Sequence, residues 1–192
     1  MKKSFLVILL LNIVLCKTSF AQYFKVKEFE YSYGESLVQV KNHSFKIQLN
    51  GQRDINMHYP LVVDSGKLTE RDTIAMIGEL LRFNGDSRIC VFPVMCYEPS
   101  WSQIFMGETK QYSLQVEALF IINQLYFKHP FKYSPFPALL NTGTETISTI
   151  KGKDIKEAYR QYTTWFKQIE KFGLAKAREQ DLVPLNGVVK WY

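Results

Sequence analysis

The sequence predicts an α+β fold, with an N-terminal antiparallel β-sheet of hairpins and about three α-helices packed against it and concentrated toward the C-terminus. Strand-forming residues in two-residue alternation fill the first part of the chain. Segments with helical spacing follow, and strands and helices do not alternate as they do in a parallel α/β sheet. The 192 residues are enough for one domain with a buried core.

The beginning of the chain predicts export. Two lysines and an apolar run over 5–15 are followed by Ser19 and Ala21, the small residues that a signal peptidase reads. The apolar run is shorter than a membrane-spanning helix, which needs about 20 residues. We therefore expect a cleaved secretory signal peptide over 1–21 and a single mature α+β domain over 22–192, in the periplasm or outside the cell. The Ala-Gln junction resembles those of exported proteins of the Bacteroidetes group of bacteria.

Cleavage would change the charge balance of the chain. The segment 1–21 holds three of the 24 basic residues and none of the 18 acidic ones, so the net charge falls from +6 for the full chain to +3. The remaining cations are scattered rather than gathered in a run. This composition argues against a nucleic-acid partner.

The predicted strands lie mostly in the N-terminal part of the mature chain. Apolar and polar residues alternate just before Asn50, as expected of a half-buried strand. The pair Asn50-Gly51 is the strongest short hairpin signal, because both residues of that turn take positive φ. The predicted strands cover 23–31, 37–41, the two arms of a hairpin over 44–59, and 61–63.

Three helices are predicted after these strands. The first begins with Thr69 as its cap. The second, over 113–127, is apolar nearly all round, which is typical of a central helix. The third begins with Asp154 as its cap, carries its apolar residues on one stripe and ends at Gly173. The segment 128–153 between them is predicted to be a long connection, of a kind that is often functional.

Two cysteines remain in the mature chain, on a strand predicted over 88–97. Along an extended strand Cys90 and Cys96 would lie too far apart to pair, so a disulfide needs a bulge or turn, which Pro93 can supply. The alternative is two buried free thiols, and both alternatives stay open. Neither implies catalysis. The three histidines lack ligand spacing, so no metal and no cofactor is expected.

The strongest candidate for a binding surface is the segment 126–137. It holds five aromatic rings, two lysines and three prolines in twelve residues. Rings on a rigid loop can stack on sugars or anchor a peptide. The alternative, in which the loop folds over the central helix and buries its rings, is favoured because exposed rings promote aggregation. The candidate ligand-binding residues are Phe131, Tyr133, Phe136 and Trp101.

The run Leu61–Gly66 contains Asp-Ser-Gly at Asp64, and with the strand and turn upstream it resembles the catalytic turn of retroviral-type aspartic proteases. The resemblance implies that Asp64 shares a proton with a second carboxylate about 3 Å away, supplied by a second copy of the motif or by a dimer. This chain has one Asp-Ser-Gly, and Lys67 stands where the family has a small residue. The alternative is an ordinary turn, in which Asp, Ser and Gly are the expected residues.

These patterns predict an exported, non-enzymatic binding or interaction domain. Its expected partner is a cell-envelope polymer, an oligosaccharide or a protein. Signatures of a nucleophilic serine or of a phosphate-binding loop are missing from the sequence. The alternative function is a hydrolase whose site is assembled around Asp64.

Overall fold

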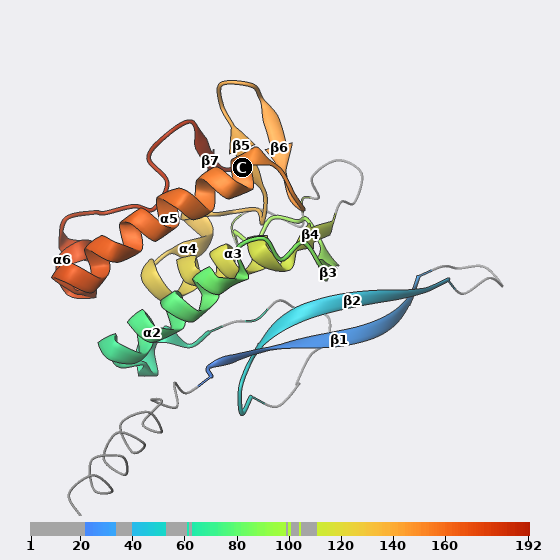
Figure 1. The fold of residues 1–192 in the computed structure, drawn as a ribbon, viewed down its shortest axis with the longest axis horizontal. Helices are drawn as coiled ribbons and strands as arrows, with labels where there is room; N and C mark the ends of the chain where they lie inside the picture. The colour runs from blue at the N-terminus through green and yellow to red at the C-terminus, as the bar shows by residue number, and fades with distance from the viewer. Residues whose placement is uncertain are drawn as a thin grey trace, which may run out of the picture.

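The computed structural model of the chain describes residues 22–33, 40–52, 61, 63–98, 100, 104 and 111–192. Three predictions lie outside these residues, namely the signal peptide over 1–21, the second arm of the hairpin over 53–59 and the candidate Trp101. The described residues combine β-sheet with helices, several of them in the C-terminal half, which confirms the predicted α+β class (Figure 1).

The first sheet is built on a long antiparallel ribbon. β1 (Phe24–Tyr33) pairs along its whole length with β2 (Val40–Leu49). β2 pairs in parallel with β3 (Ile89–Pro93) where Phe45 lies opposite Cys90. β3 pairs in turn with β4 (Gln111–Ser113), so the strand order is β1-β2-β3-β4.

Two details of the ribbon differ from the prediction. Two separate strands were expected, over 37–41 and from residue 44 onward. From Val40 they form one continuous strand, because every residue of β2 has a partner in β1. The chain does turn at Asn50-Gly51, but of this pair only Gly51 takes a positive φ, of 80°. The turn is therefore not the type in which both residues adopt a positive φ.

α2 (Glu70–Leu80) begins as predicted. The hydroxyl oxygen of Thr69 accepts a hydrogen bond from Asp72 N–H at 3.1 Å, which satisfies a donor that the first turn leaves without a helical partner. Short 3₁₀ turns flank the helix over Ser65–Lys67 and Leu81–Phe83. The apolar residues that it buries are Met76, Ile77 and Leu80.

α3 (Leu114–Tyr126) is the central helix, as its nearly uniform apolarity predicts. All 13 of its residues are buried. Ser113 occupies the N-cap position, but its hydroxyl donates to Thr149 O at 3.4 Å instead of capping the helix. Polar side chains on this helix find partners on neighbouring elements, as where Asn123 Oδ1 accepts a hydrogen bond from the Tyr162 hydroxyl at 2.6 Å.

The segment 128–153 contains more regular structure than the long connection that was predicted. It holds α4 (Pro130–Tyr133), β5 (Leu139–Asn141) and β6 (Thr146–Ser148). β5 is the middle strand of a second antiparallel sheet of order β6-β5-β7, completed by β7 (Val189–Trp191). Strands this short carry no local alternation, and two helices separate the two partners of β5 in the chain.

α5 (Lys153–Phe172) begins two residues earlier than predicted, because Gly152 and not Asp154 is its N-cap. Asp154 lies in the first turn, where its carboxylate accepts a hydrogen bond from Asn141 Nδ2 at 2.7 Å. This carboxylate therefore joins the helix to β5 rather than capping it. Gly173 ends the helix with a φ of 84°, as predicted.

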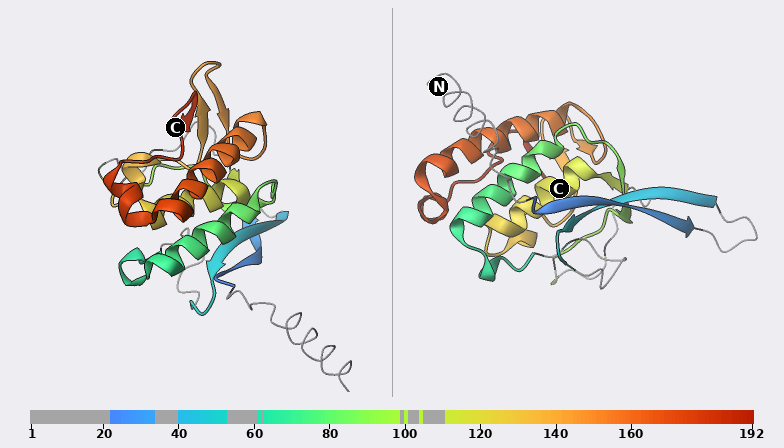
Figure 2. Two further views of the ribbon diagram at one scale, coloured as in Figure 1. Left: turned by 60° about the vertical axis from the view of Figure 1, so that its left-hand side comes forward. Right: turned by 60° about the horizontal axis from the view of Figure 1, so that its bottom comes forward.

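The helices lie between the two sheets (Figure 2). α3 packs against the strands of the first sheet, and α5 packs against β5 and β7 of the second. α6 (Leu174–Glu179) follows α5 directly and turns back toward α3, where Arg178 reaches the end of that helix. None of the described helices is long and apolar enough to cross a membrane.

Candidate functional site

The chain that follows α3 forms one wall of a pocket. α3 ends at Tyr126 with Phe127 as its C-cap, and α4 begins with Pro130, a residue favoured at the first helical position because no N–H is needed there. Ser134 ends α4, where its N–H and its hydroxyl donate to Pro130 O at 2.9 and 3.1 Å. This sharp path places Lys132 and Tyr133 against the end of α3.

The end of α6 forms the facing wall. Leu182 N–H donates to Ala177 O at 3.0 Å, and Asp181 takes a φ of 49°. This left-handed ending is common after helices, and Asp tolerates it. It reverses the chain and brings Asp181, Leu182 and Val183 to the pocket. In Figure 1, α4 and α6 lie on the side of the molecule away from the far end of the β1–β2 ribbon.

We call the hollow between these walls the ring pocket. Its volume is about 460 Å³, within the range of small-molecule sites, which is about 300–1,000 Å³. The rings of Phe127 and Tyr133 are stacked with centroids 4.1 Å apart, and Tyr126 meets Phe127 edge-on at 4.8 Å. The pocket is lined by Tyr126, Phe127, Lys128, His129, Lys132, Tyr133, Arg178, Asp181, Leu182 and Val183.

Tyr133 is fixed in its wall by its hydroxyl group. The hydroxyl oxygen accepts a hydrogen bond from Leu185 N–H at 3.1 Å. Burial raises the pKa of Tyr133 far above that of a free phenol. The side chain therefore stays neutral and provides a rigid ring surface rather than an acid or a base.

Arg178 joins the two walls. Its Nε and Nη2 donate to Tyr126 O at 2.9 Å and Leu125 O at 3.0 Å, which satisfies carbonyls that the last turn of α3 leaves without helical partners. Its guanidinium also lies over the Tyr126 ring, 5.6 Å from the centroid. These contacts hold the positive charge of Arg178 at one position on the pocket wall.

The charges around the ring pocket are unbalanced. Lys128, Lys132 and Arg178 line it, with Asp181 as the one acidic lining residue. Within the part of the chain that the structure describes, none of these three cations lies within ion-pair distance of a carboxylate, whereas Arg88 and Arg160 are each paired with one at 2.6 Å. The pocket therefore combines aromatic surface with positive charge that the described residues do not pair with a carboxylate.

The structure separates the candidate residues of the segment 126–137. Tyr133 lines the ring pocket. Phe131 instead packs among other rings, with centroids 6.0 Å from Phe120 and 6.2 Å from Tyr97. Phe136 is only 4% exposed and meets Tyr192 edge-on. The segment thus folds over the central helix with part of its rings in the core, and the role of these three residues in binding stays a prediction.

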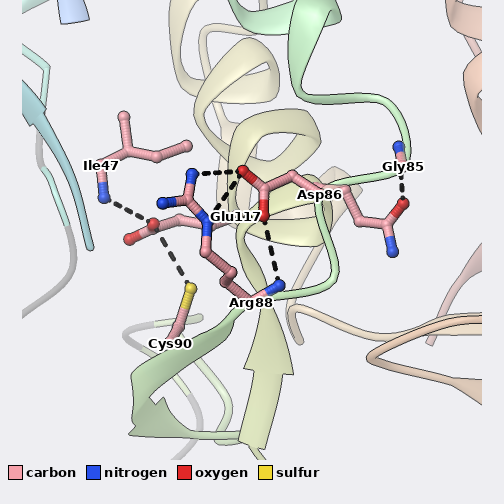
Figure 3. A network of polar contacts seen from close by, with 7 residues as sticks. Ile47, Gly85, Asp86, Arg88, Cys90 and Glu117 are labelled. Atoms are coloured by element: carbon pink, nitrogen blue, oxygen red, sulfur yellow. Dashed lines mark hydrogen bonds and ion pairs between the residues drawn. The ribbon is translucent and has the colours of Figure 1, made fainter. Parts of the chain in front are cut away.

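A second polar cluster surrounds Glu117 in the middle of α3 (Figure 3). Its Oε2 accepts hydrogen bonds from Ile47 N–H at 2.9 Å and from the Cys90 thiol at 3.5 Å. The pairing of β2 with β3 is limited to Phe45 opposite Cys90. The N–H of Ile47, two residues further along β2, donates to Glu117 instead of to a strand. Among the described residues, its other oxygen has no hydrogen-bond partner although it is buried.

Burial raises the pKa of Glu117 from 4.5 to about 7, because removing a carboxylate from water costs more than its contacts return. The hydrogen bonds from Ile47 and Cys90 and the charge of Lys46 act in the opposite direction. Because the group is fully enclosed, we interpret it as a link between α3 and the first sheet. No sequence signal other than its position on an apolar helix marks it.

Cys90 and Cys96 are both free and buried in the structure, which is the second of the two alternatives that the sequence leaves open. The Cys90 thiol points toward Glu117 (Figure 3). Burial, together with the neighbouring carboxyl of Glu117, raises the pKa of Cys90 well above its ordinary value. A thiol in such surroundings is held in its protonated, unreactive form.

Asp64 lies on an exposed turn. Its carboxylate accepts Gly66 N–H at 3.2 Å and lies 3.2 Å from the Lys67 ammonium, and its side chain is 66% exposed. These two are the contacts that Asp64 makes among the described residues. The geometry is that of the ordinary turn, which Asp-Ser-Gly also predicts.

The described residues hold no group of three or more His, Cys, Asp and Glu that could bind a metal ion. His43 is exposed, and its Nδ1 lies 2.8 Å from Glu28 Oε1. His129 borders the ring pocket.

No protein-family model, no curated protein and no solved structure matches this chain. The interpretation of the site therefore rests on its own geometry.

Proposed function

We propose that residues 22–192 form an exported, non-enzymatic binding domain and that its ligand binds in the ring pocket. The observation that carries this proposal is a hollow of about 460 Å³ whose walls combine stacked aromatic rings with cations that have no acidic partner among the described residues. Rings held by packing and by hydrogen bonds offer a preformed surface, so little conformational freedom is lost on binding.

Two other hollows of similar size lack this combination. One, between β1 and α2, is lined by Glu79, but that carboxylate already accepts the N–H groups of Tyr23 and Phe24. The other borders α5, where Glu157 accepts hydrogen bonds from both Arg160 and Gln161. In both places carboxylates of the lining are engaged by the protein itself, and among the described residues no stacked pair of rings lines either hollow, whereas Phe127 and Tyr133 are stacked in the ring pocket.

The alternative function, a hydrolase assembled around Asp64, has no comparable support. The chemistry would require a second carboxylate that shares a proton with Asp64. The contacts of Asp64 among the described residues are instead with Lys67 and a backbone N–H.

The proposal is tested by a ligand screen on the protein purified after expression of the full chain. Peptidoglycan fragments, oligosaccharides and peptides are compared by the shift in melting temperature, because a ligand that prefers the folded state raises it. A compound that raises the melting temperature of the native protein should fail to raise that of Phe127→Ala, which removes a ring from the pocket.

Ile147→Ala is the matched control, because Ile147 is an exposed apolar side chain on β6 outside the pocket. This variant should keep the full shift. A shift that survives in Phe127→Ala would place the ligand elsewhere and overturn the assignment of the site.

A further inference from the structure

The ring pocket also carries information about the chemistry of its ligand. Stacked Phe127 and Tyr133 offer the flat apolar surface on which the carbon–hydrogen face of a sugar ring packs. A site lined only by rings would accept any flat molecule, so the polar groups of the lining must provide the specificity.

The cations of the lining converge from both walls. Lys128 and Lys132 are exposed and belong to the segment around α4, while Arg178 comes from α6. Among the described residues, none of these three cations has a carboxylate within ion-pair distance. Arg88 and Arg160, by contrast, are each paired with one. Positive charge gathered in this way attracts an anionic group.

Arg178 is suited to hold such a group. Two of its N–H groups are committed to the carbonyls of Tyr126 and Leu125, which fixes the plane of the guanidinium. A guanidinium has five N–H donors, so others remain for a carboxylate or a phosphate. Asp181 adds an acceptor on the same wall, which suits the hydroxyl groups of a sugar.

We propose that the ring pocket binds a sugar ring that carries an anionic group, either a carboxylate or a phosphate. This inference rests on the proposed function and names the ligand class for the same site. The sugar ring packs on Phe127 and Tyr133, the anionic group contacts Lys128, Lys132 and Arg178, and Asp181 accepts hydrogen bonds from ring hydroxyls.

The test measures the affinity of the purified protein for glucuronate, glucose 6-phosphate, glucose, acetate and inorganic phosphate by calorimetry. At least one sugar anion should bind about tenfold or more tightly than glucose and than the free anions. Its affinity should fall as salt rises from about 0.05 to about 0.5 M, because ions screen contacts with exposed lysines. Comparison of the two sugar anions shows which anionic group the pocket prefers.

The double variant K128Q/K132Q should bind the same sugar anion about fivefold to tenfold more weakly, while its affinity for glucose stays unchanged. Both lysines are exposed, so the fold is expected to survive, and the melting temperature checks this. K156Q/K167Q removes two exposed lysines of α5 that do not line the pocket and should bind like the native protein.

Three results would overturn the inference: glucose binding as tightly as the sugar anions, free anions binding as tightly as the sugar anions, or K128Q/K132Q retaining full affinity. Absence of binding by every sugar would also overturn it. In that case the proposed function is decided separately by the broad screen, in which a peptide or polymer that loses its shift in Phe127→Ala still establishes a binding domain.

Discussion

Glu117 places a titratable group inside α3, and burial raises its pKa from 4.5 to about 7. A carboxyl group with a higher pKa in the folded than in the unfolded state stabilises the fold while it is protonated. Its contribution is fully present below about pH 4.5 and is lost as the pH rises through about 7. The two pKa values correspond to about 3 kcal/mol of unfolding free energy.

Glu117→Gln is expected to remove this pH dependence, because the amide oxygen can still accept Ile47 N–H and the side chain no longer titrates. Between about pH 5 and pH 8, the unfolding free energy of the native protein should fall relative to that of the variant by up to about 3 kcal/mol. Urea unfolding at a series of pH values measures it. Glu170→Gln, an exposed change on α5, is the control and should keep the native slope. Equal slopes for all three proteins would show that Glu117 does not titrate in this range.

The residues of the ring pocket show what a sequence can and cannot predict about this site. The density of rings, prolines and lysines over 126–137 marks one wall. Arg178 on the other wall carries no signal, since it is one of two cations on a short helix. Its position comes from the carbonyls at the end of α3, about fifty residues away in the chain. Contacts over that separation depend on the complete fold.

Among the elements, the three longer helices were predictable and most of the strand pairing was not. The first turn of α2 and the buried character of α3 follow from local cap chemistry and apolar periodicity. The second sheet is assembled from strands of three residues, and β7 lies beyond α5. The misassigned cap of α5 has a similar origin, because the Asp154 carboxylate is engaged by Asn141 on β5.

Thr69→Ala should lower the unfolding free energy by about 1 kcal/mol, because it removes the acceptor for Asp72 N–H at the start of α2. Chemical denaturation of the two proteins measures the difference. Thr163→Ala is a matched change at an exposed position in the middle of α5, where alanine favours helix, and it should cause no loss. The cap would have no energetic role if both variants lost the same stability.

At the scale of the whole molecule, the chain is held against α2 directly after the expected cleavage point. The carboxylate of Glu79 on α2 accepts Tyr23 N–H at 2.8 Å and Phe24 N–H at 2.9 Å, and the Tyr23 hydroxyl donates to Asp72 at 2.8 Å. These contacts hold the beginning of β1 against the helix. The start of the mature chain at Gln22 stays a prediction.

The proposed export predicts that residues 1–21 are removed from the exported protein. Protein recovered from the envelope or medium of a secreting bacterial host should have an intact mass that lacks residues 1–21, because the small residue at Ala21 permits cleavage. Ala21→Tyr, which puts a bulky side chain at that position, should leave the leader attached. A native protein whose mass still includes Met1 would contradict the signal peptide.

The hydrogen bonds of Arg178 couple the unwinding of α6 to the end of α3. Because its guanidinium holds the last carbonyls of α3, unwinding of α6 would remove one wall of the ring pocket and expose those carbonyls at the same moment. If a ligand binds in the ring pocket as proposed, unwinding of this short helix would also release it. Ligand occupancy would set the rate at which the backbone amides of α6 exchange their hydrogens with water.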